Sequence, residues 1–199
     1  EERAKELETY CWRHINEKHE TRELYRIFYY DCYPISKKVY HPFLDKQIDL
    51  GESDLFKWTD IFLSELKRKR KFALRMGRLA EEQASYIIRP SLTKDLTKGR
   101  LRIEDLTEED YILTVTQKGV DMKIGIDITS LAYKKQVEQI ILISGDSDFV
   151  PALKLARREG IDVVLDPMKQ QIKSDLFEHI DGIRTRIKNK DELVIKTDS

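Results

Sequence analysis

The sequence predicts an α/β fold, and two observations in residues 139–166 support this most strongly. The unbroken aliphatic run at 140–143 is typical of a strand buried on both faces. After a Ser-Gly-Asp break, a helical pattern ends at Gly160 and a second apolar run follows at 161–165. The apolar residues of that helix are Phe149, Ala152, Leu153 and Ala156. A strand–helix–strand unit of this kind predicts a parallel sheet.

Two aspartates, Asp146 and Asp148, follow the first of these strands. Ligands of parallel sheets bind at the carboxyl ends of the strands. Asp148 fits the N-cap of the following helix, with Pro151 tolerated in its first turn, whereas Asp146 has no comparable structural role. Neighbouring carboxylates repel unless a cation or a proton lies between them, and Mg²⁺ accepts one or two carboxylates while keeping its waters. The turn therefore favours a metal site, with capping and turn chemistry as the alternative.

The composition is that of a globular domain with a charged surface: 199 residues, 40% hydrophobic and 36% charged. Lys plus Arg equals Asp plus Glu, so net charge gives no indication of nucleic acid binding. No apolar run approaches the roughly 18 residues of a membrane span, no signal peptide opens the sequence, and no membrane partner is expected. Cys11 and Cys32 are too few for a disulfide scaffold and too isolated for a zinc site, so a cytoplasmic protein is expected. We expect one domain over residues 1–186 and a charged tail at 187–199.

The first third of the chain predicts a helix, a strand and an irregular segment. Residues 1–19 predict a helix whose inward stripe is Ala4, Leu7, Cys11 and Ile15. Residues 24–30 predict a strand that ends at Asp31, which could reach the same sheet edge as Asp146 or serve as a turn residue before Pro34. Residues 35–53 indicate a loop or a short helix.

The middle of the chain predicts a second amphipathic helix and further strands. The helix covers about 53–69, with Ser53 or Asp54 as its cap, and its apolar face is Leu55, Trp58, Phe62 and Leu66. Strands are expected at 72–79, 86–88 and 111–116. We expect residues 80–110 to form a hairpin or loop excursion.

Seven cations without an intervening acidic residue lie between residues 67 and 78. They are Lys67, Arg68, Lys69, Arg70, Lys71, Arg75 and Arg78. Such a run can be a solvated face whose charges suit the carboxyl end of a helix, or a track for phosphates. The sequence leaves both interpretations open.

A second acidic group lies on the helix that follows Lys118-Gly119. Its apolar stripe is Val120, Ile124, Ile128 and Leu131. At about 100° per residue, Asp127 projects into that stripe and Asp121 lies near its edge. A buried, unpaired carboxylate costs several kcal/mol, so Asp127 needs a partner. That partner is either a backbone amide or hydroxyl, or a cation shared with Asp121, Asp146 and Asp148.

Two motifs together resemble a known family. KGVDMKIGIDITSLAY at 118–133, followed by ISGDSDFVPALKLARREGIDVVL at 143–165, resembles the NYN domain, the LabA-like branch of the PIN-domain nuclease group. RIFYYDCYP at 26–34 is similar to the second strand of that family, and LFEHIDGI at 176–183 to its last helix. The resemblance implies a three-layer α/β/α sandwich with a central, mainly parallel sheet. It also implies hydrolysis of RNA phosphodiesters that depends on a divalent metal.

By this resemblance, Asp121, Asp146 and Asp148 would bind Mg²⁺ or Mn²⁺, Asp127 would support them, and Ser144-Gly145 would shape the turn. The family opens with a strand that carries an aspartate in a DGxN-like motif, whereas this sequence starts inside the following helix. We expect that first strand to lie upstream, because its loss would leave open hydrogen-bonding edges in a buried sheet. A real loss would put catalytic competence in doubt.

The leading hypothesis is therefore a metal-dependent endoribonuclease. The basic run would hold the backbone of single-stranded RNA. Tyr29, Tyr30, Tyr33 or Trp58 could stack on bases, with a place in the core or on the sheet surface as the alternative for most of them. The alternative is a catalytically weak module that binds RNA or a protein. A toprim-like domain lacks a convincing glutamate after its first strand, and a haloacid-dehalogenase-type phosphatase would carry its DxD at the start. The four histidines show no catalytic spacing, and homo-oligomer formation is left open.

Overall fold

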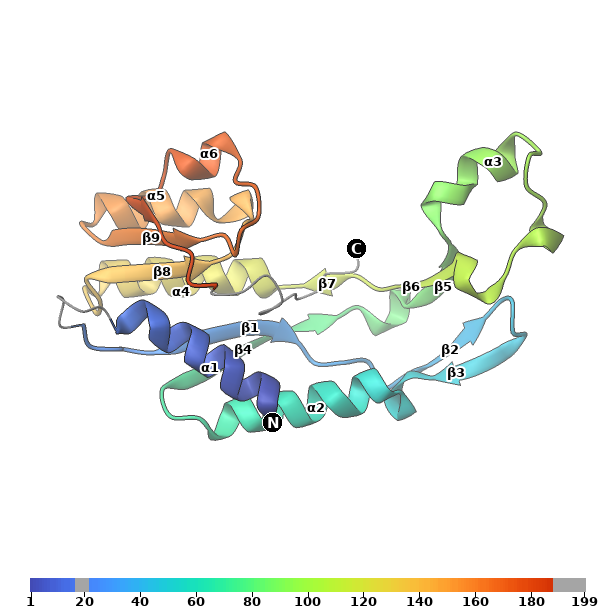
Figure 1. Ribbon diagram of the computed structural model, residues 1–199, viewed down its shortest axis with the longest axis horizontal. Coiled ribbons are helices and arrows are strands. Elements are labelled where there is room, and N and C mark those ends of the chain that lie inside the picture. The colour runs from blue at the N-terminus through green and yellow to red at the C-terminus, as the bar shows by residue number, and fades with distance from the viewer. Residues whose placement is uncertain (17–21, 188–199) are drawn as a thin grey trace. The chain divides into compact units, whose positions relative to one another are not determined.

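The computed structural model describes residues 1–16 and 22–187 and shows a mixed α/β structure with helices and several sheets (Figure 1). The chain divides into two compact units. The first comprises Glu1–Tyr29, Leu66–Arg75 and Asp121–Ser199, and the second comprises Tyr30–Glu65 and Met76–Val120. None of the described helices is both long and apolar enough to cross a membrane.

The first unit contains the predicted strand–helix–strand motif. Strand β8 (Gln139–Ile143) leads through a 3₁₀ turn (Ser147–Phe149) into α5 (Val150–Arg158) and then β9 (Asp162–Asp166). The two strands pair in parallel, and β10 (Gly182–Ile183) pairs in parallel with the other side of β9. The prediction of a parallel pair is thus confirmed. Gly160, with a φ of +81°, ends α5 as expected from its freedom to adopt the left-handed conformation.

Strands β8 and β9 differ in burial, although both are aliphatic runs in the sequence. Residues 163–166 of β9 are buried, whereas every residue of β8 is only half-buried. In the described three-stranded sheet the order is β10-β9-β8, so β8 lies at an edge. The expectation that β8 is buried on both faces is therefore wrong for this sheet. An aliphatic run alone does not distinguish a central strand from an edge strand.

Helix α1 (Glu2–Ile15) also belongs to the first unit, but a different face is turned inward from the one expected. The buried residues are Ala4, Tyr10 and His14, whereas Leu7, Cys11 and Ile15 are half-buried. The predicted stripe is thus wrong apart from Ala4, because the helix packs with polar Tyr10 and His14 against a buried carboxylate. Residues 17–19 of the predicted helix lie outside the described residues.

The remaining helices of this unit are α4 and α6. Helix α4 (Val120–Tyr133) buries Ile124 and Ile128, as its apolar spacing predicts. The helix expected at 176–183 is short, since α6 spans Ser174–Phe177 and the segment ends in β10. The strand forms there because the backbone of residues 181–184 pairs with β9: Asp181 N donates to Val163 O and Arg184 N to Leu165 O, both at 2.8 Å.

A second three-stranded sheet has the order β1-β4-β7, formed by β1 (Ile27–Cys32), β4 (Phe72–Leu79) and β7 (Gln117–Lys118). Strand β4 has the predicted limits, and it pairs antiparallel with β7. Asp31 lies inside β1 rather than after it, and its Oδ1 accepts a hydrogen bond from Cys32 N at 2.7 Å. The described strands thus form several separate sheets, and a single central, mainly parallel sheet is not confirmed.

The second unit is built from two antiparallel hairpins. One joins β2 (Lys38–His41) to β3 (Lys46–Asp49), and the other joins β5 (Ser85–Ile88) to β6 (Tyr111–Thr114) across an excursion that contains α3 (Thr93–Thr97). The loop or short helix expected at 35–53 is therefore wrong. Strand β2 alternates exposed and buried residues, and buried His41 packs on Tyr86 with ring centroids 4.2 Å apart. A small core joins the hairpins: Ile35, Val39, Leu50 and Ala84.

Helix α2 (Asp54–Arg68) begins where its cap predicts, because Ser53 Oγ accepts a hydrogen bond from Phe56 N at 3.1 Å. Its inward face is only partly as expected. Leu63 and Leu66 are buried, whereas Leu55 and Trp58 are 71% and 51% exposed. Trp58 instead stacks on Phe62, with ring centroids 5.1 Å apart and the rings within 9° of parallel.

Candidate active site at the carboxyl ends of the parallel strands

Strands β8 and β9 end side by side. Ile143 is paired with Asp166, and Ser144 N donates a hydrogen bond to Asp166 O at 3.1 Å. Two connections therefore leave the sheet from the same edge: the turn at 144–149 after β8, and the loop at 167–173 after β9 (Figure 1). This is the edge at which parallel sheets bind their ligands.

Asp146 and Asp148 are both exposed on the turn after β8. The N-cap is Asp146, whose Oδ1 accepts a hydrogen bond from Asp148 N at 3.0 Å. The prediction that Asp148 is the cap is therefore wrong, because the helix begins with a 3₁₀ turn that starts earlier than its apolar spacing indicates. Ser144 Oγ accepts from Asp146 N at 3.2 Å, so both residues shape the turn.

The two aspartates of α4 lie in different environments. Asp121 is exposed in the first turn of the helix. Asp127 is half-buried, and its Oδ2 lies 2.9 Å from Nε of Arg75, whose guanidinium also covers the ring of Phe28 at 5.0 Å. The partner that Asp127 requires is thus supplied by a cation of the chain itself.

The predicted convergence of four aspartates on one ion is not seen in this structure. Among residues 1–16 and 22–187, no group of three or more His, Cys, Asp or Glu side chains is arranged to hold a metal. Asp146 and Asp148 are the predicted ligands that share one short turn.

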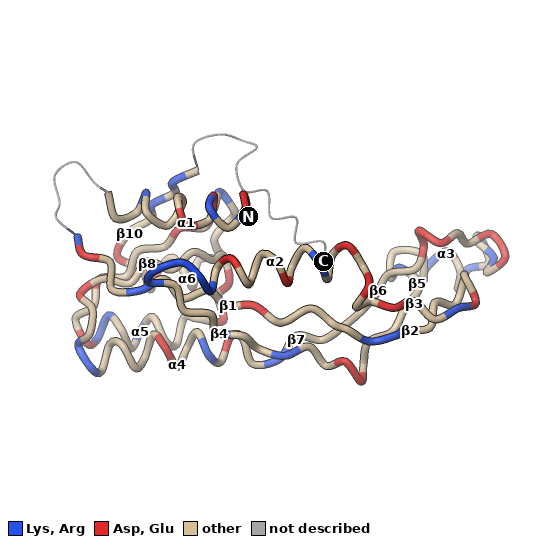
Figure 2. The backbone as a smooth tube through the Cα atoms, turned by 90° about the horizontal axis from the view of Figure 1, so that it is seen from below, with Lys and Arg blue, Asp and Glu red and all other residues tan. Residues whose placement is uncertain are grey.

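Residues 67–71 of the basic run form the end of α2 and the connection into β4, where Figure 2 shows a continuous basic segment, and Arg75 and Arg78 lie within β4. Several of its members have acidic neighbours. Lys69 Nζ lies 2.6 Å from Glu8, Lys71 Nζ lies 3.7 Å from Glu23, and Arg75 pairs with Asp127. Lys67, Arg68 and Arg70 are exposed in the first unit, and Arg78 is exposed in the second. Local ion pairs therefore reduce the positive charge that a phosphate track would use.

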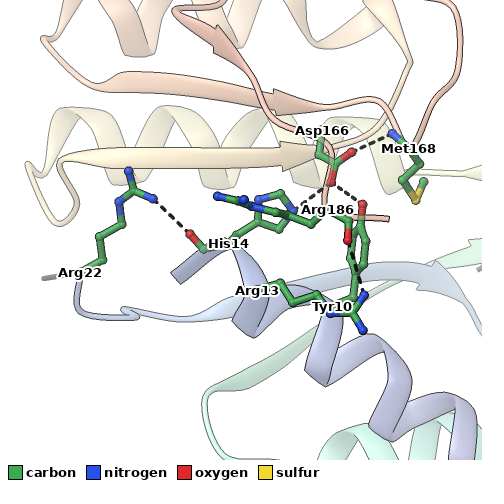
Figure 3. A network of polar contacts seen from close by, with 7 residues as sticks. All are labelled: Tyr10, Arg13, His14, Arg22, Asp166, Met168 and Arg186. Carbon is green, nitrogen blue, oxygen red and sulfur yellow. Dashed lines mark hydrogen bonds and ion pairs between the residues drawn. The ribbon is translucent and has the colours of Figure 1, made fainter. Parts of the chain in front are cut away.

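A buried polar network lies at the same edge of the sheet, and the sequence interpretation missed it. Asp166, the last residue of β9, is fully buried and accepts hydrogen bonds from the Tyr10 hydroxyl and from Met168 N, the latter at 2.8 Å (Figure 3). His14 Nε2 lies 2.9 Å from Asp166 Oδ2. Because an ionised carboxylate only accepts, Nε2 carries the hydrogen. His14 Nδ1 is buried and has no hydrogen-bond partner among the described residues.

The negative charge is favoured on Asp166 and disfavoured on Tyr10 and Cys11. Burial raises the pKa of Asp166, but hydrogen bonds from His14 and Tyr10 more than offset this and leave the pKa below its usual value. The pKa of Tyr10 is raised, first by burial and then by its hydrogen bond to Asp166. Burial also raises the pKa of Cys11 to about 12, so this cysteine is a neutral thiol near pH 7 rather than a nucleophile.

The sequence does contain a signal for this network. Asp166 follows the buried run Val163-Val164-Leu165, and an aspartate at the end of such a strand needs donors. Tyr10 and His14 are four residues apart, so they lie on one face of a helix. Their apposition to Asp166 joins positions more than 150 residues apart, which no local pattern indicates.

Comparisons with known proteins identify the family to which the chain belongs. The chain belongs to the NYN domain family, a family of PIN-like nuclease domains, whose sequence model matches residues 63–185. The chain is also similar to the uncharacterized protein MJ0482 of Methanocaldococcus jannaschii, with 25% identity over 80 residues. That match covers 36% of this chain and 33% of the relative, so this chain spans about a third of that protein's length. No solved structure matches the chain.

Proposed function

We propose that this chain is a divalent-metal-dependent endoribonuclease that hydrolyses phosphodiester bonds of single-stranded RNA. The observation that supports this most strongly is the match to the NYN family over residues 63–185. This range includes the basic run, the helix with Asp121 and Asp127, and the Ser-Gly-Asp-Ser-Asp turn.

The donor set at the turn fits a small, hard cation. Asp146 and Asp148 are exposed, and each keeps carboxylate oxygens that are not used by the single hydrogen bond between them. Mg²⁺ binds proteins through one or two carboxylates and keeps several waters, so a complete protein cage is not required. Bound there, Mg²⁺ or Mn²⁺ would lower the pKa of a water and offset charge on the phosphate. Asp121 is the third candidate ligand.

The other residues of the proposed site act on charge and position. Arg75 pairs with Asp127, so the charge of that carboxylate on α4 is offset by a cation of the chain. The exposed cations Lys67, Arg68 and Arg70 would contact the RNA backbone. Such contacts hold a strand without reading its sequence.

Cleavage of end-labelled single-stranded and duplex RNA in Mg²⁺, Mn²⁺ or EDTA tests the proposal. We expect cleavage of single-stranded RNA that EDTA abolishes. Asp146→Asn should reduce kcat/KM by about 100-fold or more, since even the residues behind a metal ligand contribute about 10–100-fold. The matched control is Asp162→Asn at the opposite end of β9, whose carboxylate bonds to Gln139. Equal rates for wild type and Asp146→Asn in both metals would contradict the proposal.

The second candidate function is a module that binds RNA or a protein without efficient cleavage. It is favoured by one observation: no set of three acidic or other ligating side chains is gathered for a metal among the described residues. This alternative predicts that wild type binds RNA equally well in EDTA and in Mn²⁺ and cleaves it in neither. Asp146→Asn would then leave the Kd unchanged.

A further inference from the structure

The loop at 167–173, which follows β9, lies directly against the turn that carries Asp146 and Asp148. Lys173 Nζ donates a hydrogen bond to Ser147 Oγ at 3.2 Å. Gln170 approaches the turn so closely that a Cβ added to Gly145 would lie 2.7 Å from its Oε1. That oxygen is the end of a flexible side chain, so the contact shows that Gln170 lies beside the turn rather than that glycine is required there.

The loop contains two residues in the left-handed conformation, and hydrogen bonds hold it in place. Met168 and Lys169 have φ values of 49° and 66°, a conformation that costs about 1–2 kcal/mol for each residue with a side chain. Asp166 Oδ1 compensates by accepting from Met168 N at 2.8 Å, and Gln170 N donates to Pro167 O at 2.8 Å. The other oxygen of Asp166 is held by Tyr10 and His14 of α1. One buried carboxylate thus connects α1, β9 and the loop.

The charge of the loop complements that of the turn. Residues 167–173 contain Lys169 and Lys173 and no acidic residue. Lys173 is exposed and makes no ion pair with a carboxylate in the described part of the chain. An ammonium group has three donors, so two remain after the bond to Ser147. A cation beside two metal-binding carboxylates is suited to an anion that binds the metal at the same time.

We propose that the 167–173 loop is the phosphate-binding loop of this site, with Lys173 contacting a phosphate of the RNA and Asp166 positioning the loop. The inference rests on the proposed function, because it assigns the substrate contact of that same turn. Lys173 is a binding residue in this scheme. Asp166 is buried, so it acts only through the loop.

The contact is tested by Lys173→Gln, with Lys154→Gln on the exposed side of α5 as the matched control. Lys173→Gln should raise KM about tenfold with little change in kcat, while the control leaves both unchanged. In EDTA, the dependence of log Kd for uncleaved RNA on log salt should become shallower by about 0.7, the value for one phosphate contact on a single strand.

The outcomes separate this inference from the proposed function. If Asp146→Asn abolishes cleavage but Lys173→Gln keeps the wild-type KM and salt slope, the loop inference is overturned and the ribonuclease stands. If wild type cleaves no RNA but Lys173→Gln lowers the salt slope, the loop binds phosphate and the ribonuclease proposal fails. If wild type neither cleaves nor binds RNA, both are wrong.

The positioning role of Asp166 is tested by a double-mutant cycle. Asp166→Asn leaves one acceptor oxygen in place of two. The side chain can then accept a hydrogen bond from the loop or from α1, but not from both. If Asp166 acts through Lys173, the double variant should have the KM of Lys173→Gln alone. If the KM increases of the two single variants multiply in the double variant, Asp166 has a merely structural role, and its positioning role is overturned. Tyr10→Phe, which removes one donor, replaces Asp166→Asn in the same cycle if the latter does not fold.

Discussion

Two aspartates at the carboxyl end of the parallel sheet differ in burial and in hydrogen bonding. Asp166, at the end of β9, is fully buried and held by Tyr10, His14 and the amide of Met168. Asp146, in the turn after β8, is exposed and accepts one hydrogen bond, from Asp148 N. Helix α1 covers the first and leaves the second open. The comparison shows that the same residue type supports the structure at the end of one strand and leaves its carboxylate exposed just after the neighbouring strand.

Removing each carboxylate should produce the largest contrast. Asp166→Ala leaves buried Tyr10 and His14 without their acceptor, which we expect to lower the free energy of unfolding by about 3 kcal/mol. Asp146→Ala removes one cap at the surface and should cost about 0.5–1 kcal/mol. Urea unfolding of both variants, with the m value checked for constancy, measures the difference. Similar losses in the two variants would contradict the contrast.

The pH dependence of the unfolding free energy should also reveal the role of Asp166. The folded pKa of Asp166 is lower than that of an unfolded aspartate, which is about 3.9. Its contribution is therefore fully present above about pH 4 and is lost as the pH falls through the folded pKa. Wild type should lose unfolding free energy more steeply than Asp166→Asn as the pH falls below about 4. Urea midpoints measured at several pH values test this, and parallel curves for the two proteins would argue against an ionised Asp166.

Tyr10→Phe should have a smaller effect than Asp166→Ala. It removes one hydrogen bond to the carboxylate but leaves those from His14 and Met168, so we expect a loss of about 1–2 kcal/mol. The ring still fills its buried position on α1. Thermal or urea unfolding checks the value, and a loss as large as that of Asp166→Ala would mean that the hydroxyl alone holds the network together.

Sequence reasoning succeeded where local pattern and fold coincide. The strand–helix–strand unit, the limits of β4 and the Ser53 cap of α2 all depend on neighbouring residues. The family was also accessible, because the motifs at 118–133 and 143–165 lie within the matched range. The hairpin of β2 and β3 was missed because its turn lacks the glycine-rich signature, and Asp45 adopts the left-handed conformation instead.

The site was less accessible because its partners are distant in sequence. Asp127 was recognised as needing a partner, but nothing local indicates that Arg75 supplies it. Asp146 was identified by its unexplained charge, whereas Asp166 was overlooked because a terminal strand residue resembles an ordinary turn residue. The metal-binding roles of Asp121, Asp146 and Asp148 stay predictions.

The contact between Tyr10 and Asp166 spans 156 positions, and this separation affects the order of assembly. The pairing of β8 with β9 requires only the short α5 crossover, whereas closing the longer loop costs about 2 kcal/mol more, since the entropic cost grows with the logarithm of loop length. During synthesis, α1 is made before β9, and the acceptor of its two polar side chains follows more than 150 residues later. Tyr10 and His14 therefore stay without Asp166 until β9 has been translated.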